Sequence, residues 1–229
     1  MIFDKTTRPH EGQPVIEKGK ALKEAKAAVI IVHGRGATAE SILTMADEVD
    51  RLAASWLAPQ AANYTWYPYS FLAPLEQNEP GLSSAIALLS EVVAKVEEAG
   101  IPKNKIVLAG FSQGACLSLE FAARNPARYG GVVALSGGVI GPELDNERYQ
   151  GDMEQTPVFL GCSDYDHHIP EERVHESADL FERLGARVTK KIYTGLGHTV
   201  NDDELNHFRS ILDEVLAGLK PDTFKSHSP

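Results

Sequence analysis

The feature that most constrains this chain is a sharp strand-to-helix turn around Ser112. An apolar run suited to a buried strand, Ile106–Ala109, leads into Gly110-Phe111-Ser112-Gln113-Gly114, and a helix-compatible run, Ala115–Arg124, follows directly. This is G-x-S-x-G in the setting that holds a serine hydroxyl above the edge of a sheet. The turn is so tight that a side chain at either flanking glycine is expected to collide with a neighbouring strand or helix. The alternative interpretation is a turn whose serine only caps the helix.

Size and composition fit an ordinary globular protein. The chain has 229 residues, of which 43% are hydrophobic and 24% charged, and it carries 22 Lys and Arg against 32 Asp and Glu, a net charge of −10. This balance argues against nucleic acid or an anionic membrane as the main partner. Two cysteines are too few for a disulfide framework, and we find no signal peptide or membrane span. We therefore expect a cytoplasmic protein with no stable membrane association; the composition makes no prediction about oligomeric state.

Strands alternate with helices along the chain. We expect an antiparallel edge over Val15–Lys26, with a turn at Gly19. Further strands are expected at Val29–Val32, Tyr64–Tyr67, Ile106–Ala109, Gly131–Leu135, Val158–Gly161 and Val188–Tyr193. The expected helices are Glu40–Leu57, Leu82–Ala99, Ala115–Arg124, Glu171–Leu184 and Asp202–Leu219. This alternation predicts an α/β fold with a mostly parallel central sheet and helices on both faces. We expect a single domain over residues 1–229, with 1–13 as a loosely attached arm and 220–229 as a frayed polar tail.

Polar groups follow several of the expected strands. Ligands of such sheets bind beyond the carboxyl ends of the strands, so the loops that follow strands are the informative ones. These loops carry His33-Gly34-Arg35, Ser112, Asp164 with Asp166, and His198. The order serine, aspartate, histidine along the chain is that of the α/β-hydrolases, and it predicts the α/β-hydrolase fold.

Each of these groups has a role in acyl transfer. A serine hydroxyl is a weak nucleophile until a base takes its proton, which an imidazole can do near neutral pH. A buried carboxylate must fix the tautomer of that imidazole and stabilise its protonated form. Attack on an ester carbonyl develops an oxyanion, which needs two preoriented N–H donors. We propose the main-chain N–H groups of Arg35 and Gln113 as these donors.

Several residues compete for the roles of base and acid. His198 stands in a glycine-bracketed loop before the last helix, which favours it as the base. The other candidate histidines are His33, His167, His168, His175 and His207. We interpret His33 as a structural residue that ties its turn to the backbone. For the acid, chain order leaves both Asp164 and Asp166 open.

A metal site is a rival interpretation of the histidine- and aspartate-rich stretch. Its ligands would come from Asp164, Asp166, His167, His168 and His175. Adjacent histidines would diverge in a loop, and the chain has no HExxH or equivalent frame. We therefore predict neither a metal nor another cofactor. Cys116 and Cys162 are expected to be small buried fillers.

Six short segments, spread from Val29 to about Leu216, form a recognisable set. They are Val32-His33-Gly34-Arg35-Gly36, Asn78-Glu79-Pro80-Gly81-Leu82, Gly110-Phe111-Ser112-Gln113-Gly114, Leu135-Ser136-Gly137, Asp164-Tyr165-Asp166 with Ile169-Pro170, and Gly195-Leu196-Gly197-His198. This set resembles the phospholipase/carboxylesterase family of α/β-hydrolases, which includes bacterial carboxylesterases and acyl-protein thioesterases. The resemblance implies a catalytic triad of Ser112, Asp166 and His198, with Asp166 chosen because it stands three residues before Ile169-Pro170. It also implies an oxyanion hole formed by the N–H groups at positions 35 and 113.

The chain departs from the family pattern at three places. Arg35 and Ala37 stand where the family usually has an apolar residue and a small acidic or polar one. Tyr67–Phe71 replaces a W-F-D motif, and His167-His168 follow Asp166 where proline is common. A main-chain donor survives a change of side chain, so these departures concern substrate preference. The Arg35 side chain either contacts an anionic substrate or is solvated.

The aromatic segment Tyr67–Leu75, in the longest connection without periodicity, has two interpretations. It packs over helix ends, or it forms one wall of an acyl pocket with Phe71, Leu72 and Leu75. We favour the pocket, because a long loop in a compact domain is often functional.

The sequence therefore predicts a serine carboxylesterase that hydrolyses small, short-to-medium-chain esters through an acyl-enzyme. An acyl thioesterase or lysophospholipase on the same residues is the alternative enzyme, and a noncatalytic hydrolase-fold binding protein is the alternative of another class.

Overall fold

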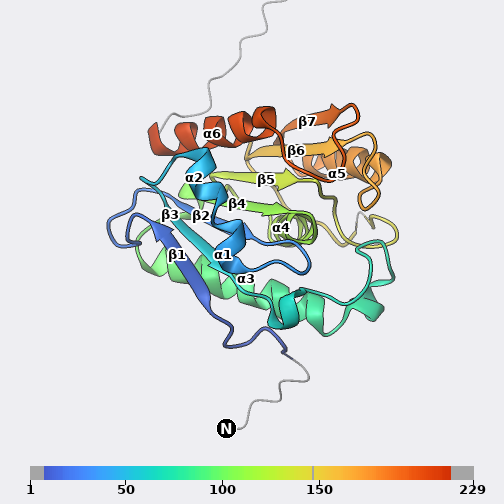
Figure 1. Ribbon diagram of the computed structural model, residues 1–229, viewed down its shortest axis with the longest axis horizontal. Coiled ribbons are helices and arrows are strands. Elements are labelled where there is room, and N and C mark those ends of the chain that lie inside the picture. Colours follow the sequence, from blue (N-terminus) through green and yellow to red (C-terminus); the bar gives the residue numbers. More distant parts are fainter. Residues whose placement is uncertain (1–7, 146, 218–229) are drawn as a thin grey trace, which may run out of the picture.

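The computed structural model describes residues 8–145 and 147–217. Within them one seven-stranded sheet has the order β1-β3-β2-β4-β5-β6-β7 (Figure 1). The strands are β1 (Val15–Gly19), β2 (Ala28–Val32), β3 (Ser55–Pro59), β4 (Ile106–Phe111), β5 (Gly131–Leu135), β6 (Pro157–Ser163) and β7 (Arg187–Tyr193). β1 pairs antiparallel with β3, and every other neighbouring pair is parallel. The predicted mostly parallel sheet is confirmed.

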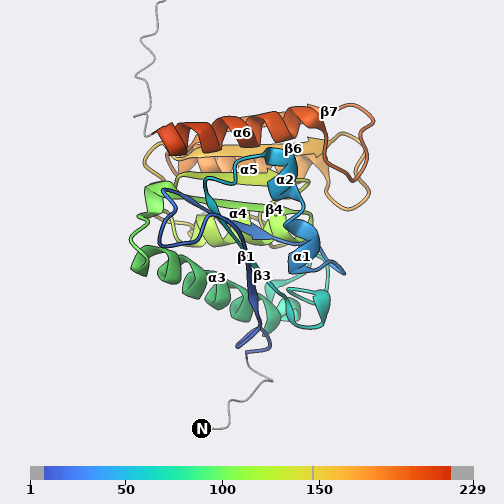
Figure 2. The same ribbon diagram turned by 60° about the vertical axis from the view of Figure 1, so that its left-hand side comes forward.

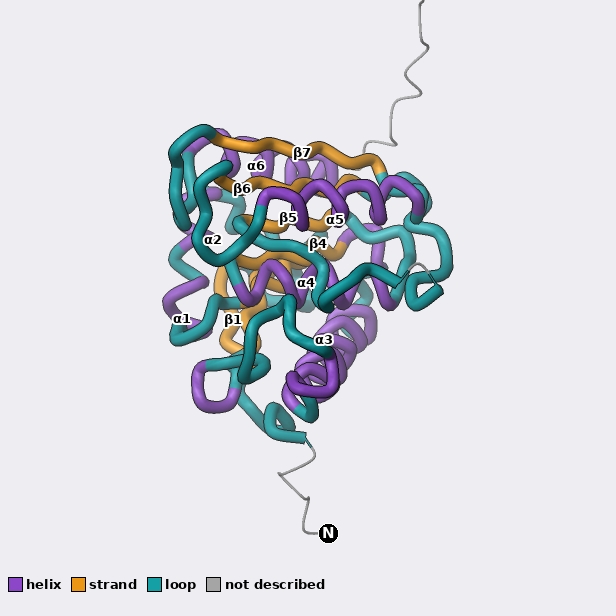
Figure 3. The backbone as a smooth tube through the Cα atoms, turned by 90° about the vertical axis from the view of Figure 1, so that its right-hand side faces the viewer, coloured by secondary structure: helices purple, strands orange, loops and turns teal. Residues whose placement is uncertain are grey.

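Helices cover both faces of this sheet (Figures 1 and 2). The elements α3 (Gly81–Glu98), α4 (Gln113–Arg124) and α5 (Glu171–Arg183) pack on one face, and α4 and α5 lie in front of the strands in Figure 3. The elements α1 (Ala39–Ile42), α2 (Met45–Val49) and α6 (Asp202–Ala217) pack on the other face. Strand residues alternate between the two cores: in β2, Ile30 joins the first and Ile31 the second. A strand buried on both faces reads as a continuous apolar run for this reason.

The register of the central strands aligns the loops that carry the polar groups. Val32 at the end of β2 pairs with Gly110 of β4, and Phe111 at the end of β4 pairs with Leu135 of β5. Because these strands are parallel, their carboxyl ends meet at one edge of the sheet. The segments that follow β2, β4, β6 and β7 therefore come together at this edge.

The helix predicted over Glu40–Leu57 is wrong. Thr38 caps the short helix α1 through a capping box, and α2 is followed by Asp50, whose φ of 55° lies in the left-handed region. The chain then enters β3, which is buried along its whole length and pairs with β1 and β2. Trp56 packs into one core and Leu57 into the other. The apolar residues here fit a helical period by chance and belong to two short helices and a strand.

Two smaller sequence predictions about strands are also wrong. Tyr64–Tyr67 is not a strand: residues 62–64 form a 3₁₀ turn in which Asn63 and Tyr64 have positive φ values. The edge predicted over Val15–Lys26 is antiparallel as expected, but its strand ends at Gly19 and its partner is β3. The predicted second segment of that edge is not a strand.

One residue of the arm predicted at 1–13, His10, packs into the protein. The His10 side chain is buried; its Nδ1 accepts a hydrogen bond from the Ala62 N–H at 3.1 Å, and its Nε2 donates to the Trp66 carbonyl at 2.9 Å. Burial lowers the pKa of His10. The described part of the arm is therefore anchored at His10. Residues 1–7, the end of the predicted last helix at 218–219 and the predicted tail at 220–229 lie outside the described residues.

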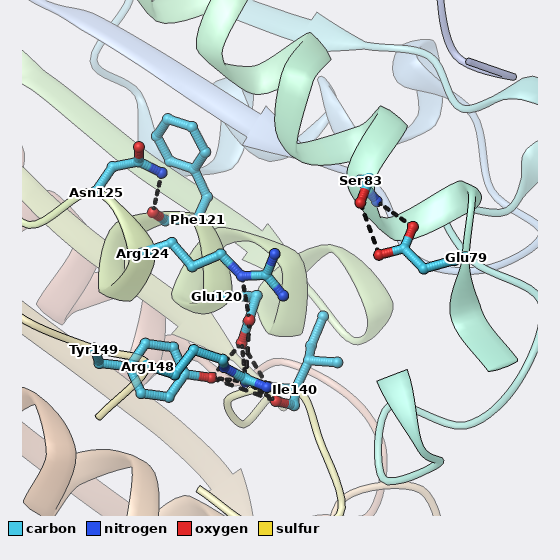
Figure 4. A network of polar contacts seen from close by, with 9 residues as sticks. All are labelled: Glu79, Ser83, Glu120, Phe121, Arg124, Asn125, Ile140, Arg148 and Tyr149. Atoms are coloured by element: carbon cyan, nitrogen blue, oxygen red, sulfur yellow. Dashed lines mark hydrogen bonds and ion pairs between the residues drawn. The ribbon is translucent and has the colours of Figure 1, made fainter. Parts of the chain in front are cut away.

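A buried polar network fastens the segment after β5 to α4 (Figure 4). The Glu120 carboxylate accepts hydrogen bonds from Arg124 Nε at 2.6 Å, the Ile140 N–H at 3.1 Å and the Tyr149 hydroxyl at 2.9 Å. Arg148 Nη2 donates to the same carboxylate at 3.2 Å and to the Ile140 carbonyl at 2.6 Å. Burial raises the pKa of Glu120, and the arginine charges offset that rise only in part. No helix of the described residues combines the length and apolar character that a membrane crossing requires.

Candidate active site

The turn around Ser112 has the strained geometry that the sequence predicts. Ser112 has φ 56° and ψ −122°, and its N–H donates to the Leu135 carbonyl at 3.0 Å. A Cβ at position 110 would lie 2.4 Å from Gly114 main-chain atoms, and one at position 114 would lie 2.1 Å from the Val32 carbonyl oxygen. Both distances are far below van der Waals contact, so only glycine fits at either position. The predicted collisions are confirmed.

Ser112, His198 and Asp166 form one chain of hydrogen bonds. His198 Nε2 lies 2.8 Å from Ser112 Oγ, and His198 Nδ1 lies 2.7 Å from Asp166 Oδ2. The three residues follow β4, β7 and β6 respectively. In the tautomer with its proton on Nδ1, the imidazole donates to the carboxylate and accepts from the hydroxyl. A base in this position can take the serine proton while the carboxylate stabilises the resulting imidazolium.

The carboxyl group of Asp166 is fully buried and well supplied with donors. Its side chain is 0% exposed, and Oδ1 accepts from the N–H groups of His168 at 2.8 Å and Ile169 at 3.1 Å. Burial raises the pKa of Asp166, but the hydrogen bond from His198 and these two main-chain donors outweigh it and lower the pKa below its usual value. The group is therefore an anion at neutral pH.

Asp164, the other candidate for the acid, lies in a different place. It is exposed, and its Oδ1 accepts from the Gly195 N–H at 2.8 Å. Ser163 Oγ accepts from the Gly197 N–H at 3.0 Å. Both side chains thus hold the loop that carries His198. Ser163 was missed by the sequence analysis, and its position at the end of a buried strand, beside the two aspartates, is the signal that could have found it.

The loop after β2 lies directly against Ser112. A Cβ on Gly34 would lie 3.4 Å from the Ser112 Cβ. The buried His33 ring donates from Nδ1 to the Gly34 carbonyl at 2.8 Å and accepts at Nε2 from the Ala61 N–H at 3.0 Å. The ring therefore ties this loop to the backbone, as interpreted from the sequence. Gln113 begins α4, and N–H groups in a first turn have no intrahelical acceptor.

Arg35 is exposed, as the solvated alternative expects, but its side chain is also held by hydrogen bonds within the protein. Its guanidinium donates to Thr65 Oγ1 at 3.0 Å, to the Pro68 carbonyl at 2.8 Å and to the Tyr69 carbonyl at 2.6 Å. The group also lies 5.9 Å from the centre of the Tyr67 ring. Arg35 therefore clamps the segment 65–69 to the loop after β2.

The Gln113 side chain holds the same segment from the other side. Its Oε1 accepts from the Trp66 N–H at 3.0 Å, and its Nε2 donates to the Tyr67 carbonyl at 2.9 Å. The segment 65–69 is therefore fastened to the elements on both sides of Ser112.

A cavity of about 550 Å³ opens beside Ser112. The residues that line it include Arg35, Tyr67, Tyr69, Phe71, Phe111, Cys116, His168, Ile169 and His198. Of the three predicted wall residues, Phe71 lines this cavity. Leu72 and Leu75 are half-buried and pack against the core, and they are not among the described residues that line this cavity. Asn78 bonds to the main chain of Tyr69 and Ser70, so the loop folds back on itself and turns these two leucines inward.

The two cysteines are buried and free, as the sequence predicts. Burial raises the pKa of both thiols to about 12, which leaves them unreactive at neutral pH. Cys116 lies one helical turn after Ser112 and contributes to the cavity wall. Among the residues that the structure describes, no group of three or more His, Cys, Asp or Glu side chains is arranged to hold a metal ion.

Residues 11–216 match the model of the Phospholipase/Carboxylesterase family. The chain belongs to this family of serine hydrolases. Its fold superposes on the crystal structure of a phospholipase/carboxylesterase from Dyadobacter fermentans with a TM-score of 0.86 and 46% identity, over 88% of this chain and 97% of that one. The acyl-protein thioesterase 1 of Debaryomyces hansenii is 29% identical over 89% of this chain and 97% of its own length. The carboxylesterase of Bacillus cereus, 20% identical, shares the fold with a TM-score of 0.68 over 91% of this chain and 97% of its own. The family membership and the α/β-hydrolase fold inferred from the motifs are confirmed.

Proposed function

We propose that this family member is a serine carboxylesterase that hydrolyses small, short-to-medium-chain esters through an acyl-enzyme. The observation that carries the proposal is the position of the His198 ring, with one nitrogen 2.8 Å from Ser112 Oγ and the other 2.7 Å from Asp166 Oδ2. The protein needs no cofactor for this reaction, since hydroxyl, imidazole and carboxylate supply the nucleophile, the base and its orienting group.

The reaction has two halves. Ser112 Oγ attacks the ester carbonyl carbon as its proton passes to His198 Nε2, and the tetrahedral intermediate places its oxyanion at the N–H groups of Arg35 and Gln113. The bond to the alcohol oxygen then breaks, the His198 proton moves to that oxygen, and the acyl group stays on Ser112. Water then attacks the acyl-enzyme with His198 as base, and the released Ser112 Oγ takes the proton back.

The cavity supports the choice of substrate. Its volume of about 550 Å³ falls within the range of small-molecule sites, and its walls include the rings of Tyr67, Tyr69 and Phe71. These aromatic surfaces suit a short or medium acyl chain.

Two measurements on Ser112→Ala test this function. We expect the variant to retain no more than a few per cent of the wild-type rate on an activated phenyl ester, with unchanged thermal unfolding. A fluorophosphonate should add one adduct to the intact mass of the wild type and none to the variant. A wild type that gains no adduct would support the noncatalytic binding protein instead.

A thioesterase is the second candidate, because the relative from Debaryomyces hansenii, 29% identical to this chain, is named acyl-protein thioesterase 1. Acetyl and butyryl esters compared with palmitoyl thioesters separate the two functions. We expect the higher kcat/KM on the short esters. A strong preference for the long thioester would contradict the carboxylesterase proposal.

A further inference from the structure

His168 occupies a position beside His198 that the proposed mechanism does not use. Its ring lines the cavity and meets the His198 ring edge-on, with 4.7 Å between ring centres and 63° between planes. The His168 N–H donates to Asp166 Oδ1, the carboxylate that also binds His198. One carboxylate thus fixes the backbone of His168 and the ring of His198. Among the described residues, none is hydrogen-bonded to the His168 ring nitrogens, and the residue is exposed.

The geometry of acyl transfer indicates which part of a substrate lies next to His168. The imidazole at 198 must reach both the serine oxygen and the alcohol oxygen that leaves, so the leaving group lies on the His198 side of Ser112. The carbonyl oxygen points the other way, toward the loop after β2 and the start of α4. A side chain packed against the His198 ring and facing the cavity therefore stands next to the leaving group.

The charge of the cavity wall indicates what kind of leaving group suits it. Arg35, His168 and His198 line the cavity, and no Asp or Glu is among the described residues that line it. The chain as a whole has a net charge of −10. The Arg35 guanidinium is already bonded to Thr65, Pro68 and Tyr69. His168 is thus the basic side chain in the wall that is free to meet a substrate and is not part of the Ser112 hydrogen-bond chain.

We propose that His168 is a specificity-determining residue that hydrogen-bonds to the leaving group, and that it favours esters whose alcohol part carries a carboxylate or a similar acceptor. This inference rests on the proposed esterase function. It concerns the acylation half of the reaction alone, because the leaving group has departed when the acyl-enzyme is hydrolysed.

Two acetate esters with phenolic leaving groups of similar acidity provide the test. Phenyl acetate and 3-acetoxybenzoate form the same acetyl-enzyme, and they differ by one carboxylate on the leaving group. We expect the wild type to have the higher kcat/KM on 3-acetoxybenzoate. In His168→Phe, which keeps a ring against His198, we expect the ratio of the two kcat/KM values to fall about tenfold, as for a lost hydrogen bond to a charged group. The breakdown rate of the acetyl-enzyme should stay the same.

The controls separate this role from a structural one. His167→Phe changes the neighbouring histidine, whose ring packs on Tyr165 and does not line the cavity, and it should leave the ratio unchanged. His168→Gln restores a donor and should recover part of the ratio. Active-site concentration is taken from the burst of phenol, which corrects for any unfolded fraction.

An unchanged ratio in His168→Phe, or an equal fall on both esters, would overturn the inference. Failure of the proposed function looks different: the wild type then shows neither a burst nor a fluorophosphonate adduct at Ser112.

Discussion

Two carboxyl groups in this molecule, Asp166 at the edge of the sheet and Glu120 beneath α4, are equally hidden from solvent but behave differently. Both side chains are 0% exposed. The pKa of Asp166 is lowered, whereas that of Glu120 is raised, although Glu120 has two arginines beside it. Asp166 lies beside His198, where hydrogen bonds outweigh burial. Glu120 lies between α4 and the segment 140–149, where burial dominates. Position in the fold therefore leaves one carboxylate bonded to His198, where we propose that it supports the chemistry, and the other holding a loop.

Of the changes compared here, Asp166→Asn should cause the largest loss of activity. An amide cannot stabilise the imidazolium at His198 and favours the wrong tautomer, so we expect kcat to fall by about 10³-fold or more. Steady-state kinetics on phenyl acetate measures this. Asp164→Asn, two residues away and bonded to the His198 loop, is the matched control and should lose far less. Similar losses in both variants would contradict the assignment of Asp166 as the acid.

Glu120→Ala should lower the stability of the protein and leave its activity largely intact. The change leaves Arg148 and the Tyr149 hydroxyl without their buried acceptor, and we expect the free energy of unfolding to fall by about 3 kcal/mol. Urea unfolding measures this, and kcat/KM at low temperature should be largely retained. Glu176→Ala is the control, since Glu176 also pairs with an arginine but its side chain is 50% exposed; it should cost about 1 kcal/mol or less. Equal costs in the two variants would show that burial does not set the difference.

Glu204 is a third buried carboxyl group, and it has fewer hydrogen-bond partners than Asp166 or Glu120. Its Oε2 accepts from the Asn201 N–H, and its Oε1 has no hydrogen-bond partner among the described residues. Burial, with a smaller contribution from the charge of Asp203, raises the pKa of Glu204 to about 7, against the opposing effect of the Asn201 N–H.

This raised pKa predicts a loss of stability at higher pH. The folded state holds the Glu204 proton to higher pH than the unfolded state, so the free energy of unfolding falls as pH rises from about 4.5 to about 7. In Glu204→Gln the group is neutral throughout and still accepts from Asn201. We expect this variant to gain about 2 kcal/mol at pH 8 and little at pH 4, measured by urea unfolding. A gain of the same size at both pH values would contradict the raised pKa.

The features that the sequence predicted best are those set by local pattern. The turn around Ser112 needs two glycines because a side chain at either position would collide with neighbouring main-chain atoms. The buried strands are recognisable as runs of apolar, largely β-branched residues. The strand β3 was missed because Trp56 and Leu57 continue the apolar spacing of the preceding helices, and only the pairing with β1 and β2 shows that they belong to a sheet.

In the candidate site, too, some residues could be predicted from the sequence and others could not. Chain order and loop position bring Ser112 and His198 together, but the choice between Asp164 and Asp166 needed the family resemblance. The inward turn of Leu72 and Leu75 depends on the bonds of Asn78 to the main chain of Tyr69 and Ser70, and the place of His168 depends on the carboxylate of Asp166. Contacts of this kind join residues whose separation in the chain carries no periodic signal.

The clamps formed by Arg35 and Gln113 restrict how this enzyme can acquire new substrates. The same two residues line the cavity beside Ser112 and hold every residue of the segment 65–69 by hydrogen bonds. A substitution that reshapes this wall therefore also disturbs the surroundings of Ser112. The wall at His168 and Ile169 is tied to Asp166 through main-chain N–H groups, which a change of side chain leaves in place. Divergence in substrate range within close relatives should accumulate on that second wall first.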